Sequence, residues 1–388
     1  MERPLSKFEA ILLLLLFIPA ISLPLAKQII IGEPATTALE GHEPHPFPKF
    51  SPRRKDLTAF AENFEGYYND HFGFRSLLLD SGNILRVKYF GLSPSPDVII
   101  GKAGWFFYTG GGSLVRLKEN TGFTGEQLEA WLHFMERRQH WLGSMGIRYL
   151  FVIPRDKQTI YPEFLPSRFS HSSPGCAIDQ LIAYISAHSS VQVLDLRDSL
   201  LAAKKHDQVY FTLDSHWNTV GAYAGYSAII KRLSEWFPGL KVVDRSQYNL
   251  VTRTAPGGDL ARMAGIPSLT SKWFDLFPAK ELATQKTMIF DLPGFAGPPI
   301  YASFTTEITP PSPLPRAVIM RDSYANGLQP YLSQNFSRIS YLYYAKFGNA
   351  EFEKALADFV TAEHPDVFID EMLERVMYDR VSVKKTGF

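Results

Sequence analysis

Three polar residues in two short segments have the side chains that a hydrolase-type active site requires. Asp214 and His216 lie two residues apart in "VYFTLDSHWNTVGAYAGY" (209–226), where a predicted strand over 208–217 leads into a predicted helix over 219–237. Residues i and i+2 of an extended segment point to the same side, so the carboxylate can orient the imidazole and stabilise its charged form. Such a pair forms a general base, and it requires a nucleophile from another segment.

The best candidate for that nucleophile is Ser323 in "PRAVIMRDSYANGLQPYL". A predicted strand over 316–323 leads directly into a predicted helix, which is the geometry of a nucleophile elbow without its G-x-S-x-G sequence. Backbone N–H groups at the start of a helix can help to hold an oxyanion. Two structural alternatives stay open: Ser323 serves only as an N-cap, and the Asp214 segment is a helix-entry loop capped by Asn218.

From residue 147 onward, continuous apolar segments alternate with helical ones. This alternation is typical of a parallel sheet covered by helices on both faces, and such sheets bind ligands at the carboxyl ends of their strands. We therefore predict an α/β fold. The other predicted strands are 147–154, 191–196, 338–344 and 366–373, and the other predicted helices are 124–146, 177–188, 324–336 and 350–364.

The first part of the chain has a different character. The uncharged segment "AILLLLLFIPAISLPLA" (10–26) predicts a signal anchor or signal peptide over residues 1–31, and we favour an uncleaved anchor with the rest of the chain outside the cytoplasm. Residues 32–56 are rich in Pro, His and charge and predict an extended linker. The main domain then covers 57–388. Its Pro- and Gly-rich part at about 240–312 lacks the strand–helix alternation and predicts an insertion over the sheet edge.

Composition limits the class of protein. With 45% hydrophobic and 20% charged residues, the 388-residue chain is globular rather than disordered. The net charge of +1 provides no basic field for nucleic acid. Cys176 is the single cysteine, so an intramolecular disulfide is excluded, and its context favours a small helix residue over a thiol nucleophile. Aromatic residues reach 14%, which suits either sugar stacking or an aromatic core.

Six segments together resemble the alginate O-acetyltransferase family of bacterial exopolysaccharide modification, whose catalytic domain is similar to the SGNH hydrolases. They follow the family's order, with Asp-x-His before the serine, which is permuted relative to ordinary SGNH enzymes. The segments are "YYNDHFGFR" (67–75), "IIGKAGWFFY" (99–108), "VIPRDKQTIYPEFLP" (152–166), "DSHWNTVGAYAGY" (214–226), "GGDLARM" (257–263) and "RDSYANGLQPYLSQNF" (321–336).

The resemblance implies an SGNH hydrolase-like parallel sheet flanked by helices, with Ser323 as nucleophile, His216 as base and Asp214 as its orienting partner. It also implies an O-acetyltransferase that moves acetyl groups onto the hydroxyls of a periplasmic polysaccharide. A membrane-bound O-acyltransferase partner would supply the acetyl groups at the inner membrane. Neither a metal nor a bound cofactor is expected.

Other residues near these motifs are weaker candidates. The oxyanion donors are not fixed by the family pattern, and by position we expect the Ser323 backbone, with Arg321 or Tyr324 nearby. The residues expected to shape the cleft are Lys157, Tyr161, Gly258 and Asp259.

Two other functions are compatible with these motifs. One uses the same three residues as the transferase, and the other uses no catalytic residue. An acetylesterase would have an identical triad and would use water as the acceptor. A membrane-tethered polysaccharide-binding or assembly protein would keep the fold without catalysis, although Ser323, His216 and Asp214 are all present. A nucleotide-binding protein is disfavoured, because "TGGGSL" (109–114) lacks the G-x-G-x-x-G spacing.

Overall fold

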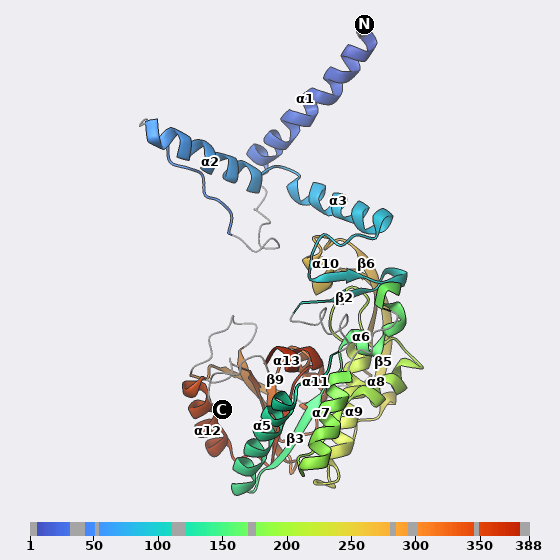
Figure 1. The fold of residues 1–388 in the computed structure, drawn as a ribbon, viewed down its shortest axis with the longest axis vertical. Coiled ribbons are helices and arrows are strands. Elements are labelled where there is room, and N and C mark those ends of the chain that lie inside the picture. Colours follow the sequence, from blue (N-terminus) through green and yellow to red (C-terminus); the bar gives the residue numbers. More distant parts are fainter. Residues whose placement is uncertain are drawn as a thin grey trace. The chain divides into compact units, whose positions relative to one another are not determined.

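The computed structural model describes residues 6–31, 43–50, 54–110, 121–169, 176–279, 285–293, 302–344 and 349–380. The chain divides into two compact units, one of residues 1–95 with 261–269 and one of residues 96–260 with 270–388 (Figure 1). Parts of the predicted signal segment (1–5), linker (32–42 and 51–53), glycine-rich loop (111–114) and insertion (280–284 and 294–301) lie outside the described residues.

The first unit contains three longer helices, α1 (Lys7–Ile30), α2 (Arg54–Asp70) and α3 (Arg75–Phe90). The Ser6 hydroxyl and the Glu9 carboxylate form a capping box that starts α1. With a mean hydropathy of 2.3 and 6% of its apolar window buried, α1 is the one helix among the described residues long and apolar enough to cross a membrane. A signal sequence has the same length and composition.

A seven-stranded sheet forms the centre of the second unit, in the order β4-β3-β11-β9-β10-β8-β7. The first five strands are parallel, and β8 and β7 extend the sheet as antiparallel strands at one edge. The predicted α/β fold with a parallel sheet is therefore confirmed. The strands are β3 (Arg148–Ile153), β4 (Val193–Asp195), β7 (Gln285–Phe290), β8 (Ser303–Ile308), β9 (Arg316–Arg321), β10 (Arg338–Tyr343) and β11 (Val367–Glu371).

Alternating side chains of each central strand pack into two separate cores. Leu150 and Val152 of β3 join the core beneath α9 and α11, whereas Tyr149, Phe151 and Ile153 join the core beneath α5, α7 and α12. This period of two explains why the strands are apolar throughout, because both faces are covered. The covering helices are α5 (Gly125–Ser144), α7 (Cys176–His188), α9 (Thr219–Leu233), α11 (Ala325–Leu332) and α12 (Ala350–Glu363).

Two hairpins and several short helices complete the second unit. β1 pairs with β2, and β5 pairs with β6. The segment 240–312 thus contributes a hairpin of its own as well as β7 and β8 of the main sheet. The remaining elements are β1 (Val98–Ile100), β2 (Phe106–Tyr108), β5 (Tyr248–Pro256), β6 (Thr270–Pro278), α6 (Lys157–Ile160), α8 (Arg197–Lys204), α10 (Asp259–Met263) and α13 (Glu374–Arg380).

The predicted strand over 208–217 is wrong. A single antiparallel bridge joins Tyr210 to Trp217, and the chain turns back between them, so Asp214 and His216 do not project from the end of a strand. The β-branched and aromatic residues suggested a strand, but tertiary contacts decided the outcome. The carbonyl oxygens of Thr212 and Asp214 accept hydrogen bonds from the Lys157 ammonium, and the Thr212 oxygen also accepts one from the N–H of Phe106 in β2 at 3.0 Å.

Asn218 connects this loop to α9. Its Oδ1 accepts hydrogen bonds from the N–H groups of Val220 and Gly221, each at 3.0 Å, and its Nδ2 donates to the Gln208 carbonyl at 2.6 Å. The side chain is almost completely buried. The expectation that Asn218 caps the helix is confirmed, and the same side chain also ties the two ends of the loop together.

We expect Asn218→Ala to lower the free energy of unfolding by about 2 kcal/mol, because it removes a cap and leaves buried backbone groups without partners. Urea unfolding of the purified protein measures this change. The matched control is Asn349→Ala, which removes the partly exposed cap of α12. Equal losses for the two variants would contradict the second role of Asn218.

Candidate active site

The structure brings the three predicted catalytic side chains into one hydrogen-bonded row. His216 Nε2 lies 2.8 Å from Ser323 Oγ, although the two residues are 107 positions apart in the chain. His216 Nδ1 lies 2.7 Å from Asp214 Oδ1. These distances are those of a nucleophile, a base and an orienting carboxylate.

Ser323 lies two residues beyond the carboxyl end of β9 and two before the start of α11. The buried carboxylate of Asp322 shapes this turn, because it accepts hydrogen bonds from the Tyr324 and Leu373 N–H groups, both at 2.8 Å. Asp322 N in turn donates to Glu371 Oε2. The Ser323 hydroxyl contacts His216, and no side-chain hydrogen bond caps α11, so the N-cap alternative for Ser323 is wrong.

Asp214 is the acceptor that closes the loop around His216. Besides facing the His216 ring, its Oδ1 accepts a hydrogen bond from the His216 backbone N–H at 2.9 Å. Its Oδ2 accepts a hydrogen bond from Asp259 N at 2.8 Å. Gly258 allows this approach, since its φ is +114° and a Cβ there would lie 2.2 Å from the Leu213 carbonyl oxygen. Only glycine fits this position without a shift of the backbone.

Asp259, expected only to shape the cleft, supplies a second carboxylate to His216. Its Oδ2 lies 3.4 Å from His216 Nδ1. It is held there by Ser215, whose N–H donates to Oδ1 at 2.6 Å and whose hydroxyl donates to Oδ2. Asp214 and Asp259 therefore both face the same ring nitrogen, which is an arrangement that stabilises the imidazolium form.

These contacts change the protonation of the site. Burial alone would lower the pKa of His216, but the hydrogen bonds and charges of Asp214 and Asp259 outweigh it and raise the pKa to about 9. Burial opposes ionisation of Asp259, yet the charge and hydrogen bond of His216 and the Ser215 donors hold the pKa of that carboxyl far below its usual value.

Lys157 lies beneath the loop and acts on its backbone. Its fully buried ammonium donates to the carbonyl oxygens of Phe106, Thr212 and Asp214 at 2.7, 2.8 and 3.0 Å. Burial lowers the pKa of Lys157 to about 7, against the opposing charges of Asp214 and Asp259. The structure therefore gives Lys157 a positioning role rather than a contact with Ser323.

Three other predicted residues also support the site from within the protein. The Tyr324 hydroxyl donates to the Ser215 carbonyl at 2.6 Å, and the Tyr161 hydroxyl accepts from Val209 N at 2.9 Å. Arg321 is buried between the rings of Phe304 and Tyr343 and donates to Asn326 Oδ1 at 2.8 Å. Burial raises the pKa of Tyr324 well above its usual range and lowers the pKa of Arg321.

Sequence reasoning missed Arg375 of α13. Its guanidinium contacts Asp156 Oδ1 at 2.6 Å and Ser215 Oγ at 3.4 Å, beside the Asp259 carboxylate that Ser215 holds. Burial and the charge of Arg375 act in opposite directions on Asp156, and the net result raises the pKa of Asp156 to about 7. The sequence pattern around Arg375 indicates no active-site role, because α13 is short and Arg375 lies 52 residues beyond Ser323.

Asp214, His216 and Asp259 also form the one cluster of metal-ligand atoms found in the described ranges, with all three atoms within 4.8 Å of one another. Each of these atoms already has a hydrogen-bond partner within the cluster or in the adjacent backbone. The three side chains therefore fit a proton on His216 Nδ1 that faces both carboxylates. We assign no metal ion to this cluster.

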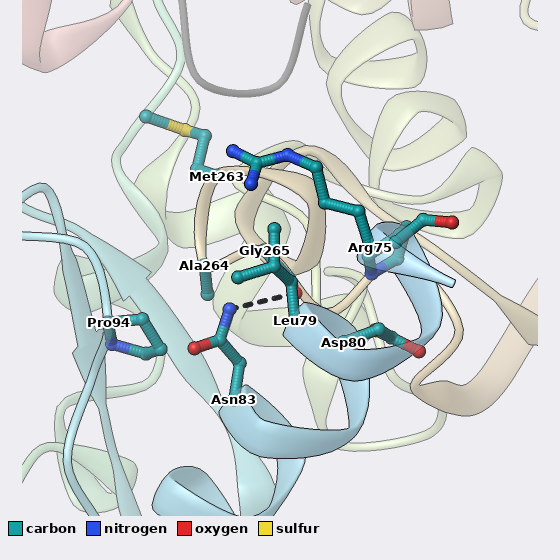
Figure 2. A pocket seen from close by; sticks show the side chains of 10 residues that line it. Arg75, Leu79, Asp80, Asn83, Pro94, Met263, Ala264 and Gly265 are labelled. Atoms are coloured by element: carbon teal, nitrogen blue, oxygen red, sulfur yellow. Dashed lines mark hydrogen bonds between the residues drawn. The ribbon is translucent and has the colours of Figure 1, made fainter. Parts of the chain in front are cut away.

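A pocket of about 330 Å³ lies elsewhere, within the first unit (Figure 2). Its lining combines residues of α3, including Arg75, Leu79 and Asn83, with Met263 and Gly265. None of the triad residues lines it.

A Ser–His–Asp row beyond the carboxyl end of a central strand of an α/β sheet is the arrangement that serine hydrolases use. Among solved structures, PatB1 of Bacillus cereus is similar to this chain with a TM-score of 0.52 and 16% identity, covering 72% of this chain and 96% of that one. Its form with a sulfonyl adduct gives a TM-score of 0.53 over the same shares. This similarity shows the fold.

The O-acetyltransferase domain of Pseudomonas putida AlgJ is 18% identical, with a TM-score of 0.47, covering 73% of this chain and 93% of that one. No curated protein matches the sequence. The family described as "SGNH hydrolase-like domain, acetyltransferase AlgX" matches residues 98–374. The chain belongs to this family, and the predicted resemblance is confirmed.

We expect the His216 ring to titrate near pH 9 in the folded protein and at a lower pH in Asp259→Asn, because that change removes a negative charge and an acceptor beside Nδ1. NMR titration of the ring resonances measures both values. Asp198→Asn, on the exposed surface of α8, is the matched control and should leave the titration unchanged. An unchanged His216 pKa in Asp259→Asn would remove Asp259 from the site.

Proposed function

We propose that this protein is an O-acetyltransferase that moves an acetyl group through an acyl-Ser323 intermediate onto a hydroxyl of an exopolysaccharide. The observation that carries the proposal is the 2.8 Å contact between His216 Nε2 and Ser323 Oγ in a chain of an acetyltransferase family. Catalysis by an activated serine requires such a contact.

In the first half-reaction, Ser323 Oγ attacks the carbonyl carbon of the acetyl donor while its proton passes to His216 Nε2. The tetrahedral intermediate collapses when the bond to the donor's leaving group breaks, and His216 returns the proton to that group. Asp214 and Asp259 stabilise the imidazolium that exists between these steps.

In the second half-reaction, a sugar hydroxyl attacks the acetyl-Ser323 ester and gives its proton to His216. The new ester bond forms as the Ser323 Oγ–acyl bond breaks, and His216 returns the proton to Ser323. No change of oxidation state occurs.

The Ser323 backbone N–H is the oxyanion donor best supported by the structure. Within the described part of the chain no group accepts a hydrogen bond from it, whereas Asp322 N and Tyr324 N both have carboxylate acceptors. It is thus available to the oxyanion that forms on the acyl group bound to Ser323. The Tyr324 hydroxyl is already committed to Ser215.

The proposed location is the periplasm, with α1 holding the protein at the inner membrane. A membrane-bound O-acyltransferase would then supply the acetyl group, and an alginate-like or other polysaccharide would be the acceptor. Three aromatic residues of the family motifs, Trp105, Trp217 and Tyr324, are buried. They are core residues, so the sequence-based idea of rings that stack on sugars has no support from these three.

We expect Ser323→Ala, His216→Ala and Asp214→Ala each to reduce acetyl transfer by about 10⁴-fold or more while the protein stays folded. The assay incubates the purified protein with a chromogenic acetyl ester and an oligosaccharide acceptor, and mass spectrometry follows the acetylated sugar and acetyl-Ser323. Asp358→Ala, an exposed residue of α12, is the matched control.

The products separate the three candidate functions. Acetylated sugar that disappears in Ser323→Ala supports the transferase. Free acetate alone, formed even with excess acceptor, would indicate an acetylesterase. A folded protein with no turnover and no acetyl-Ser323 would contradict both and favour the binding or assembly protein.

We expect kcat/KM for the acetyl ester to rise with pH, with its midpoint near pH 9, and to level off above that pH. The reason is that His216 accepts the Ser323 proton only when Nε2 is unprotonated, and the two carboxylates favour the imidazolium below its pKa of about 9. In Asp259→Asn the rising limb should move to lower pH. A rate that is independent of pH between 6 and 9, after subtraction of the Ser323→Ala background, would contradict the assignment of His216 as base.

A further inference from the structure

The exposed face of α3 carries a narrow apolar stripe. Leu78, Leu85 and Tyr89 are 58%, 53% and 77% exposed, and Leu92 just beyond the helix is 62% exposed. At 100° per residue Leu78, Leu85 and Tyr89 fall within about 40° of one another around the helix axis, and Leu92 follows Gly91, the left-handed residue that ends the helix. Three large apolar side chains on one side of a surface helix, with a fourth at its end, mark a surface that contacts something other than water.

The opposite face of α3 is already occupied within the first unit. Asn83 Nδ2 donates to the Gly265 carbonyl at 3.2 Å, and the Asp80 carboxylate accepts from the Ser268 hydroxyl. Figure 2 shows Leu79 and Asn83 directed toward the segment that carries Gly265. The stripe therefore faces away from the parts of the unit that hold α3 in place.

The aromatic residues of α2 behave differently, because the preceding segment covers them. Phe47 packs edge-on against Phe64 and Tyr67, and Phe50 packs edge-on against Phe60. α2 thus has internal partners for its rings. The stripe on α3 lacks such cover among residues 43–50.

Contacts with α1 indicate what lies against α3. Gly73, just before α3, approaches the backbone of Pro24 so closely that a Cβ would lie 2.1 Å from the Pro24 carbonyl oxygen. The Lys27 ammonium lies 4.3 Å from the centre of the Phe74 ring. Pro24 and Lys27 mark the end of the apolar run of α1, where a spanning helix passes from hydrocarbon into headgroups.

The charges beside the stripe suit the same environment. Arg86 lies on one side of it around the helix and Lys88 lies on the other, both exposed, and Asp80 is the one acidic residue of α3. Basic residues that flank a leucine and aromatic face are typical of a helix that lies in a bilayer interface. Each such cation strengthens binding to an anionic surface.

We propose that α3 lies in the interface of a phospholipid bilayer, with the stripe of Leu78, Leu85, Tyr89 and Leu92 among the acyl chains and Arg86 and Lys88 among acidic headgroups. α1 and α3 then form two successive membrane contacts. This inference rests on the proposed membrane location and is independent of the proposed chemistry.

The test uses the full chain in nanodiscs that contain phosphatidylglycerol. A polarity-sensitive fluorophore is attached at Leu85→Cys in a Cys176→Ala background, and lipids with a nitroxide on the acyl chain serve as quenchers. We expect about twofold or stronger quenching at this position. The same label at Lys354→Cys, 79% exposed on α12, is the control and should not be quenched.

A second pair of variants tests the stripe while α1 stays intact. With the label at Tyr89→Cys, Leu78→Glu with Leu85→Glu should abolish the quenching. Asn63→Glu with Asn69→Glu adds the same charge to exposed positions of α2 and should preserve it. Co-elution of the chain with the nanodisc shows that α1 still anchors the protein. Hydrolysis of the acetyl ester shows that the second unit is still folded.

The outcomes differ clearly. A chain that co-elutes without quenching at Leu85 overturns the inference and leaves the anchor in place. A chain that does not co-elute overturns the membrane location and the inference together. Protection of Leu85 in native membranes but not in lipid nanodiscs would assign the stripe to a membrane protein and contradict the lipid proposal.

Discussion

The active-site loop depends on one buried ammonium group. The segment between Tyr210 and Trp217 does not join the sheet, so its carbonyl oxygens need donors from elsewhere. Lys157 donates to the Thr212 and Asp214 oxygens, and the N–H of Phe106 in β2 also donates to Thr212. The buried ammonium is in turn satisfied by these two carbonyl oxygens and by that of Phe106. These bonds hold the backbone of residues 212–214, from which Asp214 is directed at His216 and His216 at Ser323.

The charge of the site serves two opposing needs. A base must be unprotonated to act, and the pKa of about 9 for His216 keeps most of it protonated at neutral pH. The transition state, however, contains an imidazolium, and Asp214 and Asp259 stabilise that form. Each pKa unit corresponds to about 1.4 kcal/mol between the two protonation states. The second carboxylate thus lowers the fraction of active base and, in return, stabilises the charge that develops during proton transfer.

The parts of this protein that local patterns determine were predicted well from sequence. Apolar runs of strand length located β3, β9, β10 and β11, and the strand–turn–helix pattern located Ser323. The strand predicted over 208–217 failed because the chain turns back between Tyr210 and Trp217, and its carbonyl oxygens are held by the Lys157 ammonium and by one N–H of β2. The role of Asp259 depends on the turn at Gly258, which brings it to a loop 45 residues earlier in the chain. Arg375 reaches Ser215 across 160 positions, and no local pattern reports such a contact.

The triad itself does not choose between sugar and water as the acceptor. In the proposed mechanism both acceptors would attack the same acyl-Ser323 and give a proton to the same His216 nitrogen, so the chemical steps assisted by the protein would be equal. What differs is the orientation of the acceptor. A bound hydroxyl held in line with the ester gains an effective concentration of about 10⁵–10⁸ M in favourable intramolecular cases, which exceeds that of bulk water. Under this proposal, transfer would require a surface that holds the polymer beside Ser323, and hydrolysis would be expected when that surface is empty.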